Sequence, residues 1–398
     1  MIPYGKQWIS AEDREAVLSV LQSDYLTQGP LVPKFEAAVS SKVGSQYAVA
    51  VNSATSALHI ACLALGVSEN DLVWTTPISF VATTNCALYC GARVDFVDID
   101  EVSFNMSVKA LEQKLIKAKS FGELPKVVIP VHLGGQSCNM EAIHKLSKEY
   151  GFFVIEDASH AVGAKYQDKY VGNCQFSDIA VFSFHPVKII TSGEGGMAVT
   201  NQQSLAKKMM SFRSHGITRD PELMTIEPDG AWFYQQLDLG YNYRLTDLHA
   251  ALGISQLNRL DEFISLRHKI AARYCDQLNI EAIKLPVQST DCMSSYHLFI
   301  LQLEDEEGQF SRNAVFNRLR DSEVNVNLHY IPIYRHPHYA RMGFNASEFP
   351  NAEHYYKTAI SIPMFPNLSL EEQQFVVDVI KSPCKLVFQA RNGFQDLF

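Results

Sequence analysis

The sequence lacks the patterns that mark several common classes of protein. Its 398 residues contain no internal repeat and no low-complexity segment, and no apolar run approaches the roughly 20 residues that span a bilayer. The first residues, MIPYGKQWISAEDRE, have no basic stretch followed by an apolar run, so we expect no signal peptide. These absences predict a soluble, cytoplasmic protein with no membrane partner.

Positive charge is also scarce. The chain has 34 Lys and Arg residues against 43 Asp and Glu residues, which gives a formal net charge of -9 at pH 7. A mildly acidic protein has no electrostatic reason to bind nucleic acid or anionic membranes, so we expect neither as a partner. A locally positive pocket could still bind an anion, because net charge does not report local charge.

The cysteines lack the C-x-x-C spacing of zinc and redox motifs, so the sequence predicts no metal site. Scattered thiols in a long chain are typical of a reducing compartment, and we interpret most of them as small buried hydrophobic side chains. Two of them, Cys86 and Cys90, are four residues apart, a spacing that places both on one face of a helix. The cysteines are Cys62, Cys86, Cys90, Cys138, Cys174, Cys275, Cys292 and Cys384.

What the sequence does contain is apolar material in short, regular runs. Hydrophobic residues make up 47% of the chain, enough for a large core, and the length suits about two domains. Amphipathic stretches, among them residues 54–65 and 140–150, separate the runs and are predicted to be helices. Strands are predicted at residues 47–51, 72–75, 93–97, 126–131, 152–156, 179–183 and 196–200. This alternation predicts an α/β fold with a mostly parallel, mixed sheet flanked by helices.

The pattern changes near Ala250. Residues 245–279 read as one long helix or two abutting helices, and after Pro286 a mixed stretch follows, with a strand at 297–303 and a helix at 312–322. We therefore predict a large domain at residues 1–250 and a smaller α+β C-terminal domain at residues 251–398.

In an open parallel sheet, ligands bind outside the C-terminal ends of the strands, so the residues that follow each strand are the candidates. Thr55 and Ser56 follow the first strand at the start of a helix, where they could hold a phosphate or simply cap the helix. Phe80 follows the second strand and could stack on a flat cofactor or pack in the core.

Asp157 follows the apolar strand FFVIE. A carboxylate in this position is costly to bury unless it meets a cation, and a protonated pyridine nitrogen would supply one. A capping role at a strand–helix junction is the alternative. His160 lies about one turn further on, either beside the same ring or in a structural role.

Lys188 stands between apolar neighbours in the segment SFHPVKIITSGEGG, after the strand at residues 179–183. A lysine shielded from solvent should be paired or have a depressed pKa, as the amine of a Schiff base requires. Ser183, at the end of that strand, could add a phosphate contact. A phosphate cradle, a stacking ring, a carboxylate and a buried amine together predict a site for pyridoxal 5'-phosphate.

The segments SATSALHIACLALG, EDASHA, SFHPVKIITSGEGG and LGYNYRLTD resemble the DegT/DnrJ/EryC1/StrS sugar aminotransferases, and the similarity runs from GKQWIS to about residue 369. The resemblance implies the fold-type I architecture of aspartate aminotransferase. It also implies that Lys188 carries the cofactor as a Schiff base and is the catalytic residue. One departure is Ile189, where relatives often have proline.

The same resemblance implies the other roles at the site. Asp157 would pair with the pyridine nitrogen, Phe80 would stack on the ring and His160 would sit beside the cofactor. Asn242 would reach the phosphate of the partner subunit's cofactor, so the active sites would be shared in a homodimer. The remaining implied contacts are Thr55, Ser56 and Ser183 to the phosphate, and Arg244 and His329 to the substrate.

Within the family, the segments YIPIYRHPHY and FPNAEHYYKTAISIPMFPNLS are most similar to the transaminases of pseudaminic acid biosynthesis. This similarity predicts transfer of the amino group of L-glutamate to C4 of a UDP-linked 4-keto-6-deoxy-N-acetylhexosamine. C3 or C4 amination of another UDP- or dTDP-linked keto sugar is the alternative.

Three other functions can be weighed from the residues. A sugar 3-dehydratase would keep the fold but have histidine at the lysine position, so Lys188 argues against it. A nicotinamide oxidoreductase would need G-x-G-x-x-G between a strand and a helix, and the GEGG segment is too short and leads into a strand. A non-catalytic protein that binds the cofactor or a sugar nucleotide stays open.

Overall fold

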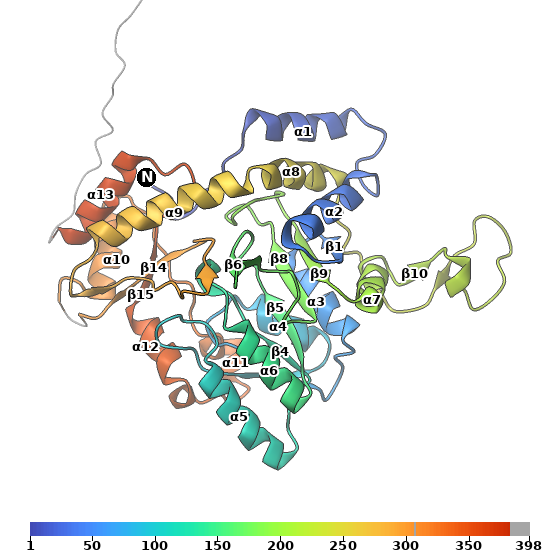
Figure 1. The fold of residues 1–398 in the computed structure, drawn as a ribbon, viewed down its shortest axis with the longest axis horizontal. Helices are drawn as coiled ribbons and strands as arrows, with labels where there is room; N and C mark the ends of the chain where they lie inside the picture. Colours follow the sequence, from blue (N-terminus) through green and yellow to red (C-terminus); the bar gives the residue numbers. More distant parts are fainter. Residues whose placement is uncertain (306–307, 383–398) are drawn as a thin grey trace, which may run out of the picture.

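A seven-stranded sheet forms the centre of the molecule, and the computed structural model describes residues 1–305 and 308–382 (Figure 1). The strand order is β1-β9-β8-β5-β4-β2-β3; β9 runs antiparallel to both neighbours, and the other neighbouring pairs are parallel. The strands are β1 Tyr47–Val51, β2 Leu72–Thr75, β3 Arg93–Phe96, β4 Val127–Ile129, β5 Phe153–Asp157, β8 Ile179–Ser183 and β9 Gly196–Thr200. The predicted mostly parallel, mixed sheet is confirmed.

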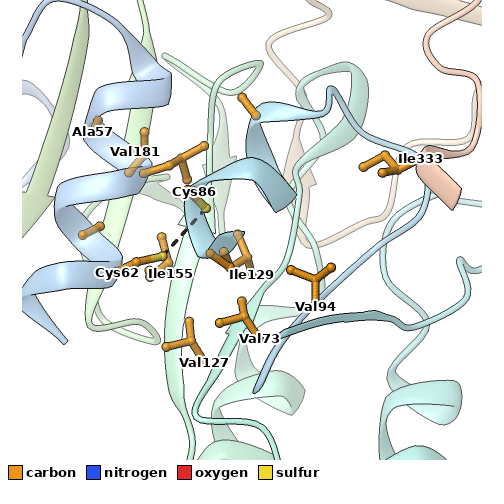
Figure 2. Packing of buried hydrophobic residues seen from close by; sticks show 14 of the residues in the cluster. Ala57, Cys62, Val73, Cys86, Val94, Val127, Ile129, Ile155, Val181 and Ile333 are labelled. Atoms are coloured by element: carbon orange, nitrogen blue, oxygen red, sulfur yellow. Dashed lines mark hydrogen bonds between the residues drawn. The ribbon is translucent and has the colours of Figure 1, made fainter. Parts of the chain in front are cut away.

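Side chains alternate across this sheet and are buried on both faces, as the apolar runs predict. In β4, Val127 and Ile129 join the cluster beneath helices α3, α4 and α7, and Figure 2 shows them with Ile155 and Val181. Val128, between them, joins the cluster beneath α5 and α6 on the opposite face, which α2 and α8 also cover. The sheet is therefore the middle layer of three.

Polar side chains fix where many helices begin, because they accept the first unpaired backbone N–H groups. Ser53 caps α3 through the Ser56 N–H, and Thr246 caps α8 through the His249 N–H. The helices are α1 Ala11–Leu21, α2 Leu31–Val43, α3 Ala54–Ala64, α4 Ala82–Tyr89, α5 Val108–Phe121, α6 Met140–Tyr150, α7 Gln203–Arg213, α8 Asp247–Asn258, α9 Leu260–Gln277, α10 Arg312–Asp321, α11 Pro337–Ala340, α12 Pro350–Thr358 and α13 Leu370–Lys381.

The predicted helical stretch near residue 250 consists of two abutting helices, α8 and α9, that meet at Arg259. Beyond them, β12 Ile283–Lys284, β14 Phe299–Leu303 and β15 Ala359–Ile362 form a separate antiparallel sheet. This sheet packs with α9, α10 and α13 in its own hydrophobic cluster, which also includes Ile2. The exact domain division at residue 250 stays a prediction.

Two small antiparallel sheets decorate the outside of this framework. One consists of β6 Lys165–Tyr166, β7 Lys169–Tyr170 and β13 Cys292–Met293. The other, β10 Ile217–Thr218 with β11 Gln235–Gln236, forms the base of an arm that projects from the body beyond α7 in Figure 1.

Within the described ranges, no helix is long and apolar enough to cross a lipid bilayer. Those same residues contain no cluster of three or more His, Cys, Asp or Glu that could hold a metal ion. Seven cysteines are free thiols there, of which Cys90 and Cys275 are half-buried and the rest buried; Cys384 lies outside the described residues.

Candidate active site

A cavity of about 370 Å³ opens at the C-terminal ends of the parallel strands. Its walls bring together residues that follow β1, β2, β5 and β8 with residues from the C-terminal third of the chain. Of the residues expected from the sequence, the cavity is lined by Thr55, Phe80, Asp157, His160, Ser183, Lys188 and His329. Strand order predicts a cavity in this position, because the loops that follow the parallel strands all leave the sheet at the same edge.

Lys188 lies in the turn after β8, partly buried, with Ile189 buried beside it. Burial lowers the pKa of the Lys188 amine to about 8, although the negative charge of Asp157 opposes this shift. An amine that loses its proton this close to neutral pH is a competent nucleophile for an aldehyde.

Asp157 is the last residue of β5 and is buried at the cavity wall. Its Oδ2 accepts a hydrogen bond from Thr83 Oγ1 at 2.7 Å, and its Oδ1 accepts one from the Ser159 N–H at 3.1 Å. None of the ion pairs in the described part of the chain involves this carboxylate. A buried carboxylate that faces a cavity without a direct cationic partner is suited to receive a cation there.

Thr83 is a site residue that our sequence reasoning missed. It lies in the first turn of α4, and its hydroxyl also pairs with Ser79 Oγ at 2.6 Å, so the two hydroxyls hold Asp157 in place. The signal was present in the sequence, because Ser79 and Thr83 are four residues apart on either side of Phe80.

His160 is held in one tautomer by its neighbours. Its Nδ1 accepts from the Gly134 N–H at 3.3 Å, and burial, with Lys188 and His329 nearby, lowers its pKa well below the ordinary value. The ring is therefore neutral with its proton on Nε2, which donates to Tyr330 Oη at 3.1 Å. Tyr330 stacks on His160 at a ring separation of 6.0 Å. Tyr330 lines the cavity as well, and because it lies 170 residues from His160 in the chain, no local pattern predicts this contact.

A third ring, His297, joins this wall. It lies 4.4 Å from His160 between ring centroids and lines the cavity. His329 lies nearby; its Nδ1 contacts Ser361 Oγ at 2.9 Å, and burial beside Lys188 lowers its pKa to about 3. The imidazoles here are therefore neutral, and the wall offers hydrogen bonds rather than charge.

The start of α3 forms the opposite end of the cavity. Ser53 and Thr55 line it, and the close approach of β9 requires glycine at 196, because a Cβ there would lie 2.4 Å from the Ala54 nitrogen. Helix N-termini present free N–H groups that bind phosphate, and Ser183 lines the cavity at the end of β8.

Ser56, expected to hold the phosphate, lies at this helix start but points elsewhere. Its hydroxyl donates to Asn52 Oδ1 at 2.7 Å and lies 3.0 Å from Ser53 Oγ, and the residue is not part of the cavity wall. In this arrangement Ser56 positions the capping residues, and Ser53, which sequence reasoning did not single out, faces the cavity instead.

The remaining expected residues lie at the edge of the cavity or outside it. Phe80 is exposed at the wall, with its ring 6.2 Å from that of Tyr330. Asn242 is exposed and pairs through its backbone with Ser214, and Arg244 pairs through its backbone with Val51; neither lines the cavity within this chain.

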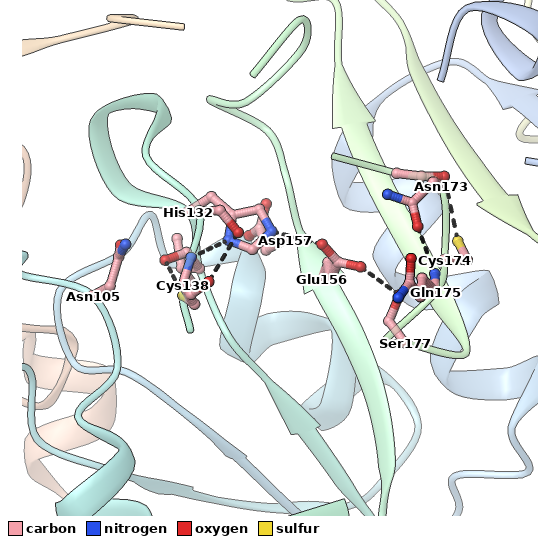
Figure 3. A network of polar contacts seen from close by, with 12 residues as sticks. Asn105, His132, Cys138, Glu156, Asp157, Asn173, Cys174, Gln175 and Ser177 are labelled. Carbon is pink, nitrogen blue, oxygen red and sulfur yellow. Dashed lines mark hydrogen bonds and ion pairs between the residues drawn. The ribbon is translucent and has the colours of Figure 1, made fainter. Parts of the chain in front are cut away.

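Behind Asp157, a second polar cluster fills the other face of the sheet (Figure 3). Glu156 accepts hydrogen bonds from His132 Nε2 at 2.8 Å and from Ser177 Oγ at 2.5 Å. His132 Nδ1 in turn accepts from the Cys138 N–H at 3.1 Å, so its proton is on Nε2. None of these side chains lines the cavity, and the cluster ties β5 to its neighbouring loops.

Solved structures of similar fold identify the class. Helicobacter pylori PseC, an aminotransferase involved in the biosynthesis of pseudoaminic acid, aligns over 95% of this chain and 97% of its own, with a TM-score of 0.85 and 32% identity. The PLP form of a Streptococcus pneumoniae sugar aminotransferase aligns over 96% and 98%, with a TM-score of 0.86 and 26% identity. Fold and cavity together define a pyridoxal-phosphate-dependent sugar aminotransferase.

The family follows from sequence comparison. The model of the DegT/DnrJ/EryC1/StrS aminotransferase family matches residues 7–381. UDP-4-amino-4,6-dideoxy-N-acetyl-beta-L-altrosamine transaminase of Campylobacter jejuni is 37% identical over 383 residues, which cover 96% of this chain and 97% of that protein. The chain belongs to the DegT/DnrJ/EryC1/StrS aminotransferase family, which implies a nucleotide-linked keto sugar as substrate together with an amino donor.

The cavity fits the cofactor of this family. Asp157 offers an unneutralised carboxylate, Lys188 an amine of lowered pKa, and α3 a helix N-terminus, which match a pyridinium, an aldehyde and a phosphate respectively. When bound, pyridoxal phosphate supplies the electron sink that stabilises negative charge on the amino-acid carbon. The three complementary groups line one cavity and come from three different strand ends.

Proposed function

We propose that this protein transfers the amino group of L-glutamate to C4 of a UDP-linked 4-keto-6-deoxy-N-acetylhexosamine. The supporting observation is the similarity over nearly the whole chain to the Campylobacter jejuni transaminase, whose name specifies a UDP-linked 4-amino-4,6-dideoxy-N-acetyl sugar, and to Helicobacter pylori PseC, an aminotransferase of pseudoaminic acid biosynthesis. C3 or C4 amination of another UDP- or dTDP-linked keto sugar is the alternative.

In this proposal Lys188 would hold the cofactor, and its Nζ would move a proton between the carbon of the amino donor and the cofactor's C4′ carbon, and later between C4′ and the sugar carbon. Its lowered pKa keeps a fraction of the amine unprotonated near neutral pH, so that it can accept a proton. Asp157, held by Thr83, would keep the pyridine nitrogen protonated, and His160, held by Gly134 and Tyr330, would sit beside the cofactor ring.

The other walls position the reactants. Thr55 and Ser183 would contact the phosphate, Phe80 would stack on the ring and His329 would contact the substrate. Arg244 does not line its own cavity, so its contact with the substrate would be in the partner subunit's site. Ser56 acts on the phosphate by ordering the start of α3. Binding energy from the nucleotide is available to place the sugar carbon against the cofactor, because the nucleotide itself does not react.

We further propose a homodimer in which Asn242 reaches the partner subunit's cofactor phosphate. Two observations support it. Asn242 is exposed and outside its own cavity, and the arm around β10 and β11 projects from the body with exposed Ile226, Trp232 and Leu239 (Figure 1). Large exposed apolar side chains on a projecting arm are typical of a protein–protein contact.

The substrate proposal is tested with UDP- and dTDP-linked 3-keto and 4-keto sugars, each assayed with glutamate. We expect kcat/KM to be highest, by tenfold or more, for the UDP-linked 4-keto-6-deoxy-N-acetylhexosamine, with 2-oxoglutarate formed in equal amount; roughly 1.4 kcal/mol of selective binding suffices. NMR of the product locates the new amine. A preferred dTDP sugar, or an amine at C3, would replace the proposal by its alternative.

The shared site is tested by mixing the Lys188→Ala and Asn242→Ala variants under conditions of subunit exchange. Each variant alone lacks one part of every site. A mixed dimer would contain one site with both native residues, so random mixing should restore about a quarter of the wild-type activity. Lack of recovery, with exchange verified by labelled subunits, would show that each site is built from one chain.

A further inference from the structure

His297 lines the active-site cavity, and its ring has no hydrogen bond to any other group of the described residues. The residue lies just before β14 and is 5% exposed, and its Nδ1 is enclosed by protein without a partner. Nε2 is not enclosed in this way, so it is the ring nitrogen that opens towards the cavity. A buried polar side chain without a partner is unfavourable, and a ligand in the cavity would supply the missing hydrogen bond.

Backbone contacts on both sides of His297 hold the ring in place. The Leu298 N–H donates to the Gly134 carbonyl at 3.2 Å, and Ser295 Oγ donates to the His160 carbonyl at 2.7 Å. The rings of His160 and His297 lie 4.4 Å apart between centroids, but both nitrogens of His160 already have partners. His297 is therefore a preorganised group, which loses little freedom when it binds a ligand.

A buried positive charge lies directly behind this part of the wall. Arg267, on α9, is 1% exposed, and its Nη1 donates to the carbonyls of Tyr296 at 3.0 Å and His297 at 3.3 Å. None of the ion pairs among the described residues involves Arg267. Burial lowers its pKa to about 9, so the guanidinium is still charged at pH 7. An uncompensated cation behind the wall favours an anionic group in front of it.

The His297 ring itself is neutral and can act as a donor. Burial lowers its pKa well below the ordinary value, with a further lowering by the neighbouring His160 and Lys188. A neutral imidazole has its proton on one nitrogen, and Nδ1 has no acceptor, so we place the proton on Nε2. Lys188 is the only Lys or Arg of the described residues that lines the cavity, and the cofactor would occupy it. A carboxylate that enters the cavity therefore needs another partner.

We propose that His297 binds a carboxylate of the amino donor, with Nε2 donating to a carboxylate oxygen and the charge of Arg267 behind it. This role rests on the proposed amino transfer from glutamate, and it holds whichever keto sugar accepts the amine. An anionic group gains from the hydrogen bond and from Arg267, whereas a neutral group gains from the hydrogen bond alone. His297 would thus help to select the donor.

The contact is tested with glutarate, which has the two carboxylates of glutamate but no amine, and with the cofactor-loaded protein. Titration calorimetry should give a Kd at least about tenfold higher for the His297→Phe variant than for wild type, because a hydrogen bond to a charged group is lost. The His297→Gln variant, whose amide places a donor near the position of Nε2, should stay within about threefold of wild type. The His144→Phe variant is the matched control and should bind as wild type does, because this half-buried histidine on α6 lies outside the cavity.

Three results would overturn the proposal. Equal Kd values for His297→Phe and wild type would show that the ring does not contact the carboxylate. A Kd raised as much in His297→Gln as in His297→Phe would show that the ring acts through packing. An altered cofactor absorption spectrum in His297→Phe, with the Kd for glutarate unchanged, would assign the contact to the cofactor. Failure of the proposed amino transfer is measured separately, because wild-type protein would then form no 2-oxoglutarate from glutamate.

Discussion

Two adjacent carboxylates at the end of β5 have opposite surroundings. Glu156 faces α6, and His132 and Ser177 satisfy its two oxygens within the protein. Asp157 faces α4 and the cavity, where Thr83 and Ser159 hold its oxygens but no cation pairs with them directly. Both are buried polar groups at the same strand end. The difference teaches that burial alone does not mark a functional carboxylate; a buried carboxylate that also faces a cavity does.

Among the residues that line the cavity, Lys188 should have the largest effect on activity when it is replaced. The Lys188→Ala variant should fold normally but lose at least about 10³-fold in turnover, because it lacks both the covalent attachment point and the proton carrier. The Lys145→Ala variant, which changes an exposed lysine on α6, is the control and should keep full activity. Borohydride reduction of the wild-type protein should leave the cofactor on the peptide that contains Lys188. A cofactor found on another peptide would contradict the assignment.

The contrast itself is tested by changing each carboxylate to its amide. The Asp157→Asn variant should lose roughly 10²–10³-fold in kcat, because the charge opposite the pyridine nitrogen disappears. Its stability should change little, because removing a buried charge that faces the cavity offsets the weaker hydrogen bonds from Thr83 and Ser159.

The Glu156→Gln variant should lose about 1–3 kcal/mol of unfolding free energy, because His132 and Ser177 hydrogen-bond a neutral amide less strongly than a carboxylate. Its activity per folded molecule should stay within a few-fold of wild type.

Chemical denaturation and single-turnover kinetics on both variants separate the two outcomes. If Glu156→Gln slowed turnover as strongly as Asp157→Asn, the two sides of β5 would not be functionally distinct. A loss of stability in Asp157→Asn comparable to that of Glu156→Gln would show that Asp157 is also a structural group.

Much of the fold and part of the site could be predicted from the sequence. Strands β1, β2, β8 and β9 have the predicted bounds, because each is a short apolar run between turn residues. Asp157 and Lys188 could be singled out because each stands next to such a run, at the edge where ligands bind in parallel sheets. A local pattern was sufficient for these positions.

The rest depends on contacts between segments distant in the chain. Tyr330 contacts His160, which lies 170 residues earlier in the chain, and no spacing in the sequence predicts this contact. Ser56 shows the opposite case. Its position at a helix start was predicted correctly, but its hydroxyl donates to Asn52, and no sequence pattern predicts this rotamer. The partners of Glu156 come from the loop after β4 and the turn before β8, so its structural role could not be told from that of Asp157 beforehand.

Burial of the Lys188 amine should also lower the stability of the folded protein. In the cofactor-free protein the folded pKa of Lys188 is about 8, below the value of about 10.4 in an unfolded chain. The unfolded state therefore binds more protons between these values, and this contribution to stability rises as the pH rises from 8 to about 10.4. The Lys188→Met variant should be more stable than wild type at pH 7, by at most roughly 3 kcal/mol, and the difference should disappear near pH 10.5. Urea denaturation of both apoproteins across this range measures it; a difference independent of pH would point to packing instead.

The smallest predicted effect on kcat that still distinguishes the cavity side of β5 from the Glu156 side is that of replacing Tyr330. In the Tyr330→Phe variant His160 keeps its neutral tautomer through Gly134 but loses the acceptor for its Nε2 proton, so the ring is held less firmly beside the cofactor. One such hydrogen bond contributes about 1 kcal/mol, which corresponds to a decrease of about fivefold in kcat. The Tyr334→Phe variant is the matched control: Tyr334 is buried and donates to Glu353 at 2.7 Å outside the cavity, so its loss should lower stability and leave kcat unchanged. Equal losses of kcat in the two variants would mean that Tyr330 acts through packing, and that the wall formed by His160 is structural like the cluster around Glu156.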